Sequence, residues 1–431
     1  MKLSTPKNVQ KLRKALYERA KRDPSLRFYS LYDKVHRHDV LAHAYALCRA
    51  NKGAAGPDGV TFEDIEGSGG PGPMLARLAE ELKTKQYTPG PVRRVYIPKA
   101  NGGERPLGIP DICDRVVAMA VKLVLEPIFE ADFEADSYGF RPGRDAHQAL
   151  AAIRESVAAG MAWVVDADVS KCFDTIPHDK LMRTVASRVV DGSMLALIKK
   201  MLTAPVVDER DGGRRTRPRA GTPQGGPASP LLANIYLHLV DRNFRRRVER
   251  GELQGRLVRY ADDMVIVCPR HPRLEREWMG RLLDRMGLTL HPDKTRVVHV
   301  GEEWVDFLGY RIRCRKGGRV ALDIAKKAMA RIRDELRAIT RRSFLSREEV
   351  ISELNVYIRG AGEYFRLAES RSLWNLDRFV LARIARWARH KRVRRLPEWS
   401  LARGTRLYRE HGLATWWRRK QPTRTPAWAR S

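Results

Sequence analysis

The stretch RLVRYADDMVIVC, residues 256–268, constrains the fold more than any other part of the sequence. Apolar residues on both sides of Asp262 and Asp263 predict two β-strands, so the acids fall at or beside a hairpin turn. Aspartate suits turns, and a plain turn is one interpretation. Two charges beside strands apolar enough to be buried are costly, however, unless they are paired or bind a metal. These residues alone leave both interpretations open.

A second group of acids lies in VVDADVSKCFDTIPHDKL, residues 164–181. Asp166 and Asp168 end a predicted buried strand and share one face, because side chains two apart on a strand do so. Alone, the group could belong to the start of the helix predicted at 178–190. With the acids at 262 and 263 it also suits phosphoryl transfer, in which carboxylates from separate strands hold two Mg²⁺ ions about 4 Å apart. Magnesium uses few carboxylates, together with waters and substrate phosphates.

The charge balance indicates a polyanionic partner. The 431 residues carry a formal net charge of +31 with 43% hydrophobic residues, which is typical of a folded protein of two or three domains. No run approaches the roughly 18 apolar residues of a membrane span. The five cysteines are spread widely and form no CxxC pair, which argues against a zinc module or a disulfide framework and favours a reducing compartment.

Hydrophobic periodicity and the placement of glycine and proline divide the chain into helical and loop-rich stretches. Helical spacing covers 115–135 and 144–159, the stretch 211–230 is basic and loop-rich, and the pattern is almost wholly helical from about 325. The last 51 residues contain fifteen Lys/Arg, two Asp/Glu and five of the nine tryptophans. A charge run is usually a solvated face, but this density with interleaved aromatics favours a surface that binds phosphates and stacks on bases.

Seven blocks in order, from about 53 to 312, resemble a reverse transcriptase of the type encoded by group II introns. The motifs include VRRVYIPKANGGERPLGIPDICDRVV, SYGFRPGRDAHQAL, DADVSKCFDTIPHD, AGTPQGGPASPLLANIYLH, the YxDD box YADD, HPDKTRVVHV and VDFLGYRI. The resemblance implies an α+β right-hand polymerase, with fingers and palm built on an RRM-like antiparallel sheet with helices, followed by an all-helical thumb and maturase domain. The implied domains are a basic N-terminal extension (1–35), fingers with part of the palm (36–165), the palm with the catalytic site (166–312) and the thumb/maturase domain (325–431).

The same resemblance implies the metal site. Asp168 and Asp262 are expected to bridge two Mg²⁺ ions, for which Mn²⁺ is a substitute, and Asp263 is the third, supporting acid. The backbone carbonyl of Val169 is expected to complete one metal's shell. Asp166 matches no family ligand.

The implied nucleotide site has five members, Lys99, Arg105, Val169, Phe173 and Gln224, and the implied catalytic set adds Lys294 to the three acids. Lys99 and Arg105 suit triphosphate binding, Arg as a bidentate clamp and Lys as a point charge. Gln224 is expected to contact the incoming sugar and base, and Phe173 to exclude a 2′-OH. Lys294 is a candidate general acid for the leaving pyrophosphate.

Primer and template contacts are also implied. The FLGY turn, Phe307, Leu308, Gly309 and Tyr310, resembles the turn that holds the primer end. Arg141 and Arg144 of GFRPGR either touch template phosphates or brace the fingers. Cys172 stands where the family often has a second Phe, and we expect altered packing there without loss of activity.

The region ELNVYIRGAGEYF, residues 353–365, resembles the thumb and maturase-specific region, which binds structured intron RNA and helps it splice. No Cys/His-rich endonuclease block follows, so we expect the short type, without second-strand cleavage. The expected partners are intron RNA, an RNA template with a DNA primer, target DNA and dNTPs, with no membrane. We expect a cytoplasmic protein that associates with the nucleoid when bound to DNA. The oligomeric state is left open.

The leading hypothesis is therefore an RNA-directed DNA polymerase, working by two-metal nucleotidyl transfer, that also assists intron splicing and retrohoming. One alternative is the same fold recruited to defence, CRISPR adaptation or repair. Another is a maturase that acts only as an RNA-binding splicing factor, against which the intact acids Asp168, Asp262 and Asp263 argue. An RNA-dependent RNA polymerase is disfavoured by Phe173, which leaves no room for an rNTP sugar.

Overall fold

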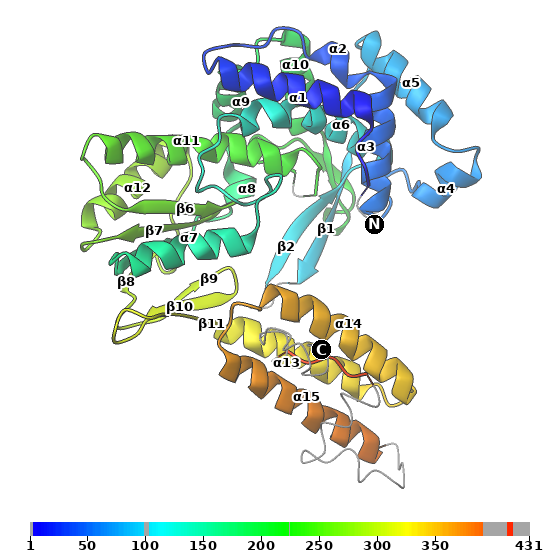
Figure 1. Ribbon diagram of the computed structural model, residues 1–431. Coiled ribbons are helices and arrows are strands. Elements are labelled where there is room, and N and C mark those ends of the chain that lie inside the picture. The colour runs from blue at the N-terminus through cyan, green and yellow to red at the C-terminus, as the bar shows by residue number, and fades with distance from the viewer. Residues whose placement is uncertain (1–2, 99–102, 224, 391–411, 417–431) are drawn as a thin grey trace, which may run out of the picture. The chain divides into compact units, whose positions relative to one another are not determined.

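A computed structural model describes residues 3–98, 103–223, 225–390 and 412–416 (Figure 1). The chain forms two compact units, one from residues 1–152 and 165–297 and the other from residues 153–164 and 298–431. The four domains predicted from the motifs have different limits and stay a prediction. None of the helices in the described ranges combines the length and the apolar character that a membrane span needs.

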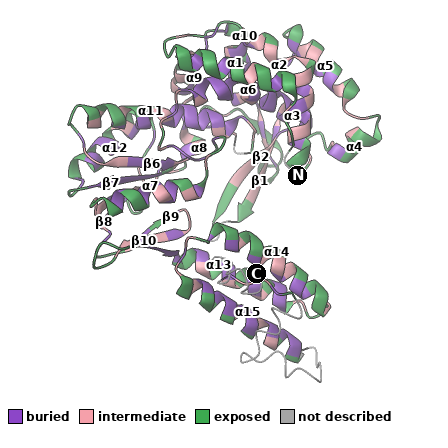
Figure 2. Ribbon diagram, viewed as in Figure 1, coloured by how far each residue is buried: buried purple, intermediate pink, exposed green. Residues whose placement is uncertain are grey.

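Helices make up most of the first unit. Helix α6 is its centre, because apolar residues cover nearly its whole circumference and fifteen of its nineteen residues are buried (Figure 2). Helices α1 and α3 pack directly on α6. The helices are α1 (Lys7–Arg22), α2 (Tyr32–Val35), α3 (His38–Ala50), α4 (Phe62–Gly67), α5 (Gly72–Lys83), α6 (Ile112–Glu130), α8 (Cys172–Thr175), α9 (His178–Ala186), α10 (Gly192–Leu202), α11 (Ser229–Glu249) and α12 (Arg273–Met286), with α7 (Ala146–Ala158) crossing the unit boundary along the chain.

One four-stranded sheet has the order β2-β1-β4-β5. Its strands are β1 (Val92–Pro98), β2 (Glu104–Ile109), β4 (Val206–Asp208) and β5 (Arg214–Thr216), and the short 3₁₀ helix η1 (Glu209–Asp211) precedes β5. Strands β1 and β2 pair antiparallel, with Ile97 opposite Arg105. The sequence predicts a loop-rich stretch over 211–230, and within it the structure places the short strand β5, paired with β4. Three residues are too few for side-chain alternation to reveal a strand.

A second four-stranded sheet has the order β6-β7-β3-β8. Its strands are β6 (Arg256–Tyr260), β7 (Asp263–Cys268), β3 (Trp163–Ala167) and β8 (Arg296–His299). Strand β7 is buried from Met264 to Cys268 (Figure 2), and α11 packs on β6 (Figure 1). The apolar runs that predicted two strands around the paired aspartates therefore form two largely buried strands of this sheet.

The second unit contains a three-stranded sheet and a helical part. The sheet has the order β11-β10-β9, and α13 contacts both α14 and α15. The elements are β9 (Val305–Phe307), β10 (Tyr310–Cys314), β11 (Val320–Ile324), α13 (Lys326–Arg341), α14 (Arg347–Tyr364) and α15 (Ser370–His390). The expected α+β class, with a helical region from about 325, is confirmed.

Candidate active site

The hairpin β6–β7 carries the paired aspartates. Tyr260 lies opposite Asp263, so Ala261 and Asp262 form a two-residue turn. Ala261 has φ +57°, a left-handed conformation that costs a residue with a Cβ on the order of 1–2 kcal/mol. The surrounding structure must therefore hold this turn in place.

A fully buried arginine, Arg259, supports the turn through a hydrogen bond to its backbone. The guanidinium of Arg259 is 0% exposed and donates to both carboxylate oxygens of Asp241, the shortest contact being 2.6 Å. It also donates to the side chains of Asn234 at 2.8 Å and Ser137 at 2.7 Å, and to the backbone carbonyl of Ala261 at 3.0 Å. Every nitrogen of the guanidinium is thus satisfied, as a buried charge requires.

The backbone of a glycine also packs against this turn. A Cβ added to Gly139 would lie 2.9 Å from the carbonyl carbon of Tyr260 and closer still to the amide nitrogen of Ala261. Asn234 donates to the carbonyl of Gly139 at 2.7 Å and so fixes that backbone. The SYGFRPGR motif therefore contributes a close backbone contact to the acidic turn.

Asp168 follows the end of β3, the strand next to β7 in the sheet. Its Oδ2 lies 3.6 Å from the Nζ of Lys294. The preceding acid, Asp166, faces Arg296 at 3.4 Å. The structure thus brings Asp168 and Lys294 together.

The three acids influence one another electrostatically. Burial, and then the charge of Asp168, raise the pKa of Asp262, while Arg105 and Arg259 oppose the shift. The side chain of Asp263 reaches solvent. Desolvation of its carboxyl group by the surrounding protein, and then the carboxylates of Asp262, Asp168 and Asp166, nevertheless raise its pKa to about 6. The cations among the described residues therefore compensate the negative charge at this turn only in part.

These residues fit a divalent cation on chemical grounds. Neighbouring carboxylates whose ionised forms are disfavoured gain from a bound cation, and hard oxygen donors are what Mg²⁺ prefers. The backbone bridge between Val169 and Leu290 uses the amide of Ser170 and the carbonyl of Asp168, so neither of its hydrogen bonds occupies the Val169 carbonyl. Within the described ranges no three His, Cys, Asp or Glu side chains are close enough to form a complete protein shell. Magnesium does not need one, since it retains waters and substrate phosphates.

The backbone of Phe173 contacts the residue that precedes the PQGG motif. Its carbonyl accepts a hydrogen bond from the amide of Thr222 at 2.7 Å, and its ring meets Phe140 edge-on with centroids 6.5 Å apart. The neighbouring Cys172 is buried, and burial raises the pKa of its thiol to about 12. Gln224, like Lys99, lies outside the described residues.

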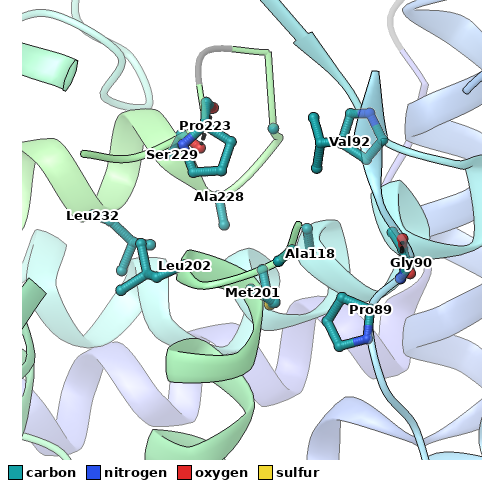
Figure 3. A pocket seen from close by; sticks show the side chains of 14 residues that line it. Pro89, Gly90, Val92, Ala118, Met201, Leu202, Pro223, Ala228, Ser229 and Leu232 are labelled. Atoms are coloured by element: carbon teal, nitrogen blue, oxygen red, sulfur yellow. Dashed lines mark hydrogen bonds between the residues drawn. The ribbon is translucent and has the colours of Figure 1, made fainter. Parts of the chain in front are cut away.

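Pro223 and Gly226, at the two ends of the PQGG motif, line a small apolar cavity of about 40 Å³. Figure 3 shows Val92, Ala118 and Leu232 around it, with Pro223 and Ser229 on the side of the turn. The hydroxyl of Ser229 donates to the carbonyl of Pro223 at 2.7 Å and closes the turn. A Cβ on Gly225 would strike the backbone of β2, so the turn also abuts the strand that carries Arg105.

The two arginines of GFRPGR have different surroundings. Arg141 is buried, binds the Glu130 carboxylate at 2.7 Å and donates to the carbonyls of Glu134 and Ser137. Of the two predicted roles, these contacts favour bracing of the fingers by Arg141 over contact with a template phosphate. Arg144 stacks over the ring of Tyr138, 5.6 Å from its centroid.

The FLGY turn lies in the second unit. Leu308 and Gly309 both have positive φ, which confirms a turn between β9 and β10. Tyr310 is fully buried and its hydroxyl donates to the Tyr364 carbonyl, while the hydroxyl of Tyr364 donates to the carbonyl of Leu308 at 2.7 Å. The turn is therefore tied to the end of α14. Its role at a primer end stays a prediction.

Sequence reasoning missed the residues that support the turn, Arg259, Asp241, Asn234 and Gly139. The one available signal was Arg259 itself, a charge within the apolar strand of RLVRYADD. A strand charge between residues expected to be buried indicates a buried partner.

Comparison with known proteins identifies the relatives of this chain. Residues 97–312 match the family model described as reverse transcriptase (RNA-dependent DNA polymerase), and residues 329–404 match the group II intron, maturase-specific domain. Protein YkfC of Escherichia coli (strain K12) is 33% identical over 341 residues, covering 70% of this chain and 88% of the relative. The group II intron-encoded protein LtrA of Lactococcus lactis subsp. cremoris is 28% identical over 446 residues, covering 82% and 73%. An uncharacterized 91 kDa protein in the cob intron of Schizosaccharomyces pombe is 28% identical over 448 residues, covering 85% and 54%.

Proposed function

Because this chain belongs to the reverse transcriptase (RNA-dependent DNA polymerase) family and carries a group II intron maturase-specific domain, we propose that it copies RNA into DNA and binds intron RNA. The reaction is the addition of a dNTP to a primer 3′-OH on an RNA template. Splicing assistance and retrohoming belong to the same proposal.

The observation that carries the polymerase proposal is the electrostatic coupling of Asp168, Asp262 and Asp263. They come from two neighbouring strands, and the charge of Asp168 raises the pKa of both other acids. A turn used only to reverse the chain gains nothing from three carboxylates that repel one another. A cation site does gain from such carboxylates, because the bound cation offsets their mutual repulsion.

Asp168 and Asp262 would hold two Mg²⁺ ions, or Mn²⁺ as a substitute, with Asp263 in support and the Val169 carbonyl completing one shell. Bound there, such ions supply activation of the primer hydroxyl and stabilisation of the leaving oxygen. The protein's own contribution is to keep the acidic turn rigid through Arg259 and Gly139, so that the carboxylates need not reorganise during the reaction.

The remaining site residues serve the nucleotide. Arg105 lies close enough to Asp262 to lower its pKa, and in this position its guanidinium would bind a triphosphate. Lys294, 3.6 Å from Asp168, would deliver a proton from Nζ to the leaving pyrophosphate. Phe173 would occupy the space of a 2′-OH and so select dNTPs. Lys99 and Gln224 complete the proposed set.

The partners follow from the two matched domains. Intron RNA is the proposed ligand of the helical region, and an RNA template with a DNA primer and target DNA are the proposed ligands of the polymerase. A protein with these partners would work in the cytoplasm and at the nucleoid.

Primer extension on poly(rA)/oligo(dT) with dTTP and Mg²⁺ tests the polymerase. We expect extension by the wild type, loss of at least about 10³-fold in Asp262→Ala, and far weaker extension with rNTP in a parallel lane. Asp166→Asn is the matched control. It removes a carboxylate that lies near the site, faces Arg296 and is outside the proposed metal set.

Absence of extension by the wild type over a range of salt and metal concentrations would refute the polymerase. The second candidate, a maturase that acts only as an RNA-binding splicing factor, would then be favoured by the maturase-specific domain. An intron-splicing assay would test it directly. The polymerase could instead be recruited to defence, CRISPR adaptation or repair. In that case the protein would extend primers but would not support intron splicing.

A further inference from the structure

A basic hollow lies within the helical part of the second unit. It is formed by the C-terminal end of α13, the residues that follow it, and α15, and has a volume of about 460 Å³. Its lining consists of Thr340, Arg341, Ser343, Arg383, Arg386 and Trp387. Three guanidinium groups and two hydroxyl groups therefore surround one space.

One of these arginines is held in position by a neutral partner. The Nε of Arg383 donates to the hydroxyl of Thr340 at 2.9 Å, and that hydroxyl donates to the carbonyl of Leu336 at 2.7 Å. The contact orients the guanidinium without neutralising its charge. The Nη donors of Arg383 therefore remain for another acceptor.

The described residues leave the charge of the hollow uncompensated. Within the described part of the chain, Arg341, Arg383 and Arg386 form no ion pair, whereas the neighbouring Arg342 pairs with Glu353. Burial, and then the charges of other arginines, chiefly Arg386, lower the pKa of Arg383. An ordinary solvated face would spread such charges apart, so their convergence suits an anionic ligand.

We propose that this hollow binds a backbone phosphate of structured RNA. The inference rests on the proposed function, because it names the place where the helical region would bind its RNA. Planar guanidinium forks match phosphate oxygens bidentately, and the hydroxyl of Ser343 suits the same ligand. Binding of the phosphate would relieve the repulsion among the three arginines.

An RNA phosphate fits the surroundings better than free phosphate. Phe344, directly after Ser343, exposes 77% of its surface. An exposed aromatic ring beside a phosphate site is what an adjacent unpaired base can stack on. The hollow is also larger than a single inorganic anion requires.

The test compares full-length variants Arg383→Gln and Arg386→Gln with the control Arg389→Gln. Arg389 is exposed on the same helix and does not line the hollow. The affinity for a fluorescein-labelled structured RNA, such as a hairpin with an unpaired loop, is measured by anisotropy at several KCl concentrations. We expect each lining variant to bind the RNA about 10-fold more weakly than the wild type. In the double variant Arg383→Gln/Arg386→Gln, the slope of log Kd against log [KCl] should fall by about one unit. The control should change binding less than threefold.

Two further readouts separate the possible failures. Thermal unfolding shows whether the variants fold, and primer extension on poly(rA)/oligo(dT) shows whether the polymerase works. Equal effects of Arg383→Gln and Arg389→Gln, or no effect of either, would overturn the phosphate site while leaving extension intact. If 10 mM inorganic phosphate stabilises the wild type but not Arg383→Gln, and both bind the labelled RNA equally, the ligand is a free anion and the RNA assignment is wrong. Wild type that neither extends primers nor binds the RNA would instead refute the proposed function itself.

Discussion

The guanidinium of Arg259 donates to the carbonyl of Ala261 at 3.0 Å, which ties a fully buried charge to the turn that carries Asp262. The charge is balanced by Asp241, itself buried. Arg259 is thus a positioning residue for the acidic turn. It acts on the carboxylates only through the backbone.

Asp241→Asn should lower the free energy of unfolding by about 3–5 kcal/mol, because it leaves the Arg259 charge buried without a counterion. Urea unfolding followed by circular dichroism measures this. Arg259→Lys should lower kcat at least 10-fold while the KM for dNTP changes little, since lysine cannot hold Asp241 and Ala261 together. The control is Arg256→Gln on the same strand, whose partly exposed pair with Asp136 should contribute less than about 1 kcal/mol. Equal losses of stability in Arg256→Gln and Asp241→Asn would contradict this account.

Gly139→Ala should displace the turn, because the added Cβ meets the backbone of Tyr260 and Ala261 rather than a movable side chain. We expect primer extension to fall at least 10-fold with little change in RNA affinity. Gly192→Ala is the matched control, since a Cβ there meets nothing within 4 Å. Normal extension by Gly139→Ala would show that the turn can shift without cost.

Removing the charge of Asp263 should stabilise the protein in the absence of metal. Its pKa is raised in the folded state, so ionisation disfavours folding: the stability lost grows as pH rises from about 4 to about 6 and persists at pH 7. Asp263→Asn removes that loss. Because the side chain reaches solvent, we expect a gain of no more than about 1 kcal/mol at pH 7, and none at pH 4. Thermal unfolding at both pH values measures it, and a wild type more stable than the variant at pH 7 would contradict the sign.

Magnesium should stabilise the wild type through the same acids. Titration with Mg²⁺ should raise the Tm of the wild type, and raise it far less in the Asp168→Asn/Asp262→Asn double variant. Asp166→Asn should respond as the wild type does. An equal response in all three proteins would place the cation elsewhere.

Phe173→Ala should relax sugar selection. Without the ring we expect the ratio of dNTP to rNTP incorporation to fall at least 10-fold, measured by single-nucleotide primer extension. Phe140→Ala should have a smaller effect, since Phe140 only meets the Phe173 ring edge-on. An unchanged ratio in Phe173→Ala would remove this residue from the nucleotide site.

Local patterns were enough to predict the hairpin around Asp262, the helical C-terminal region and, through ordered motifs, the family. They could not predict the network under the turn. Asp241, Asn234 and Ser137 lie 18, 25 and 122 residues from Arg259, and each is unremarkable in its own segment. Only the packing of α11 and the SYGFRPGR loop on β6 makes them partners. Close backbone approach at Gly139 is equally invisible in one sequence, because a glycine in a loop has many ordinary explanations.

The burial of Cys172 has a practical consequence for labelling. A thiol that is 1% exposed and has a pKa near 12 stays protonated at neutral pH and should resist maleimides and iodoacetamide. Cys48 and Cys268 are buried in the same way. Cys113 and Cys314 are partly accessible, and each lies in a different compact unit. The natural sequence thus offers one spin-label position in each unit, so distances between the units could be followed by pulsed electron resonance without engineering a cysteine-free background.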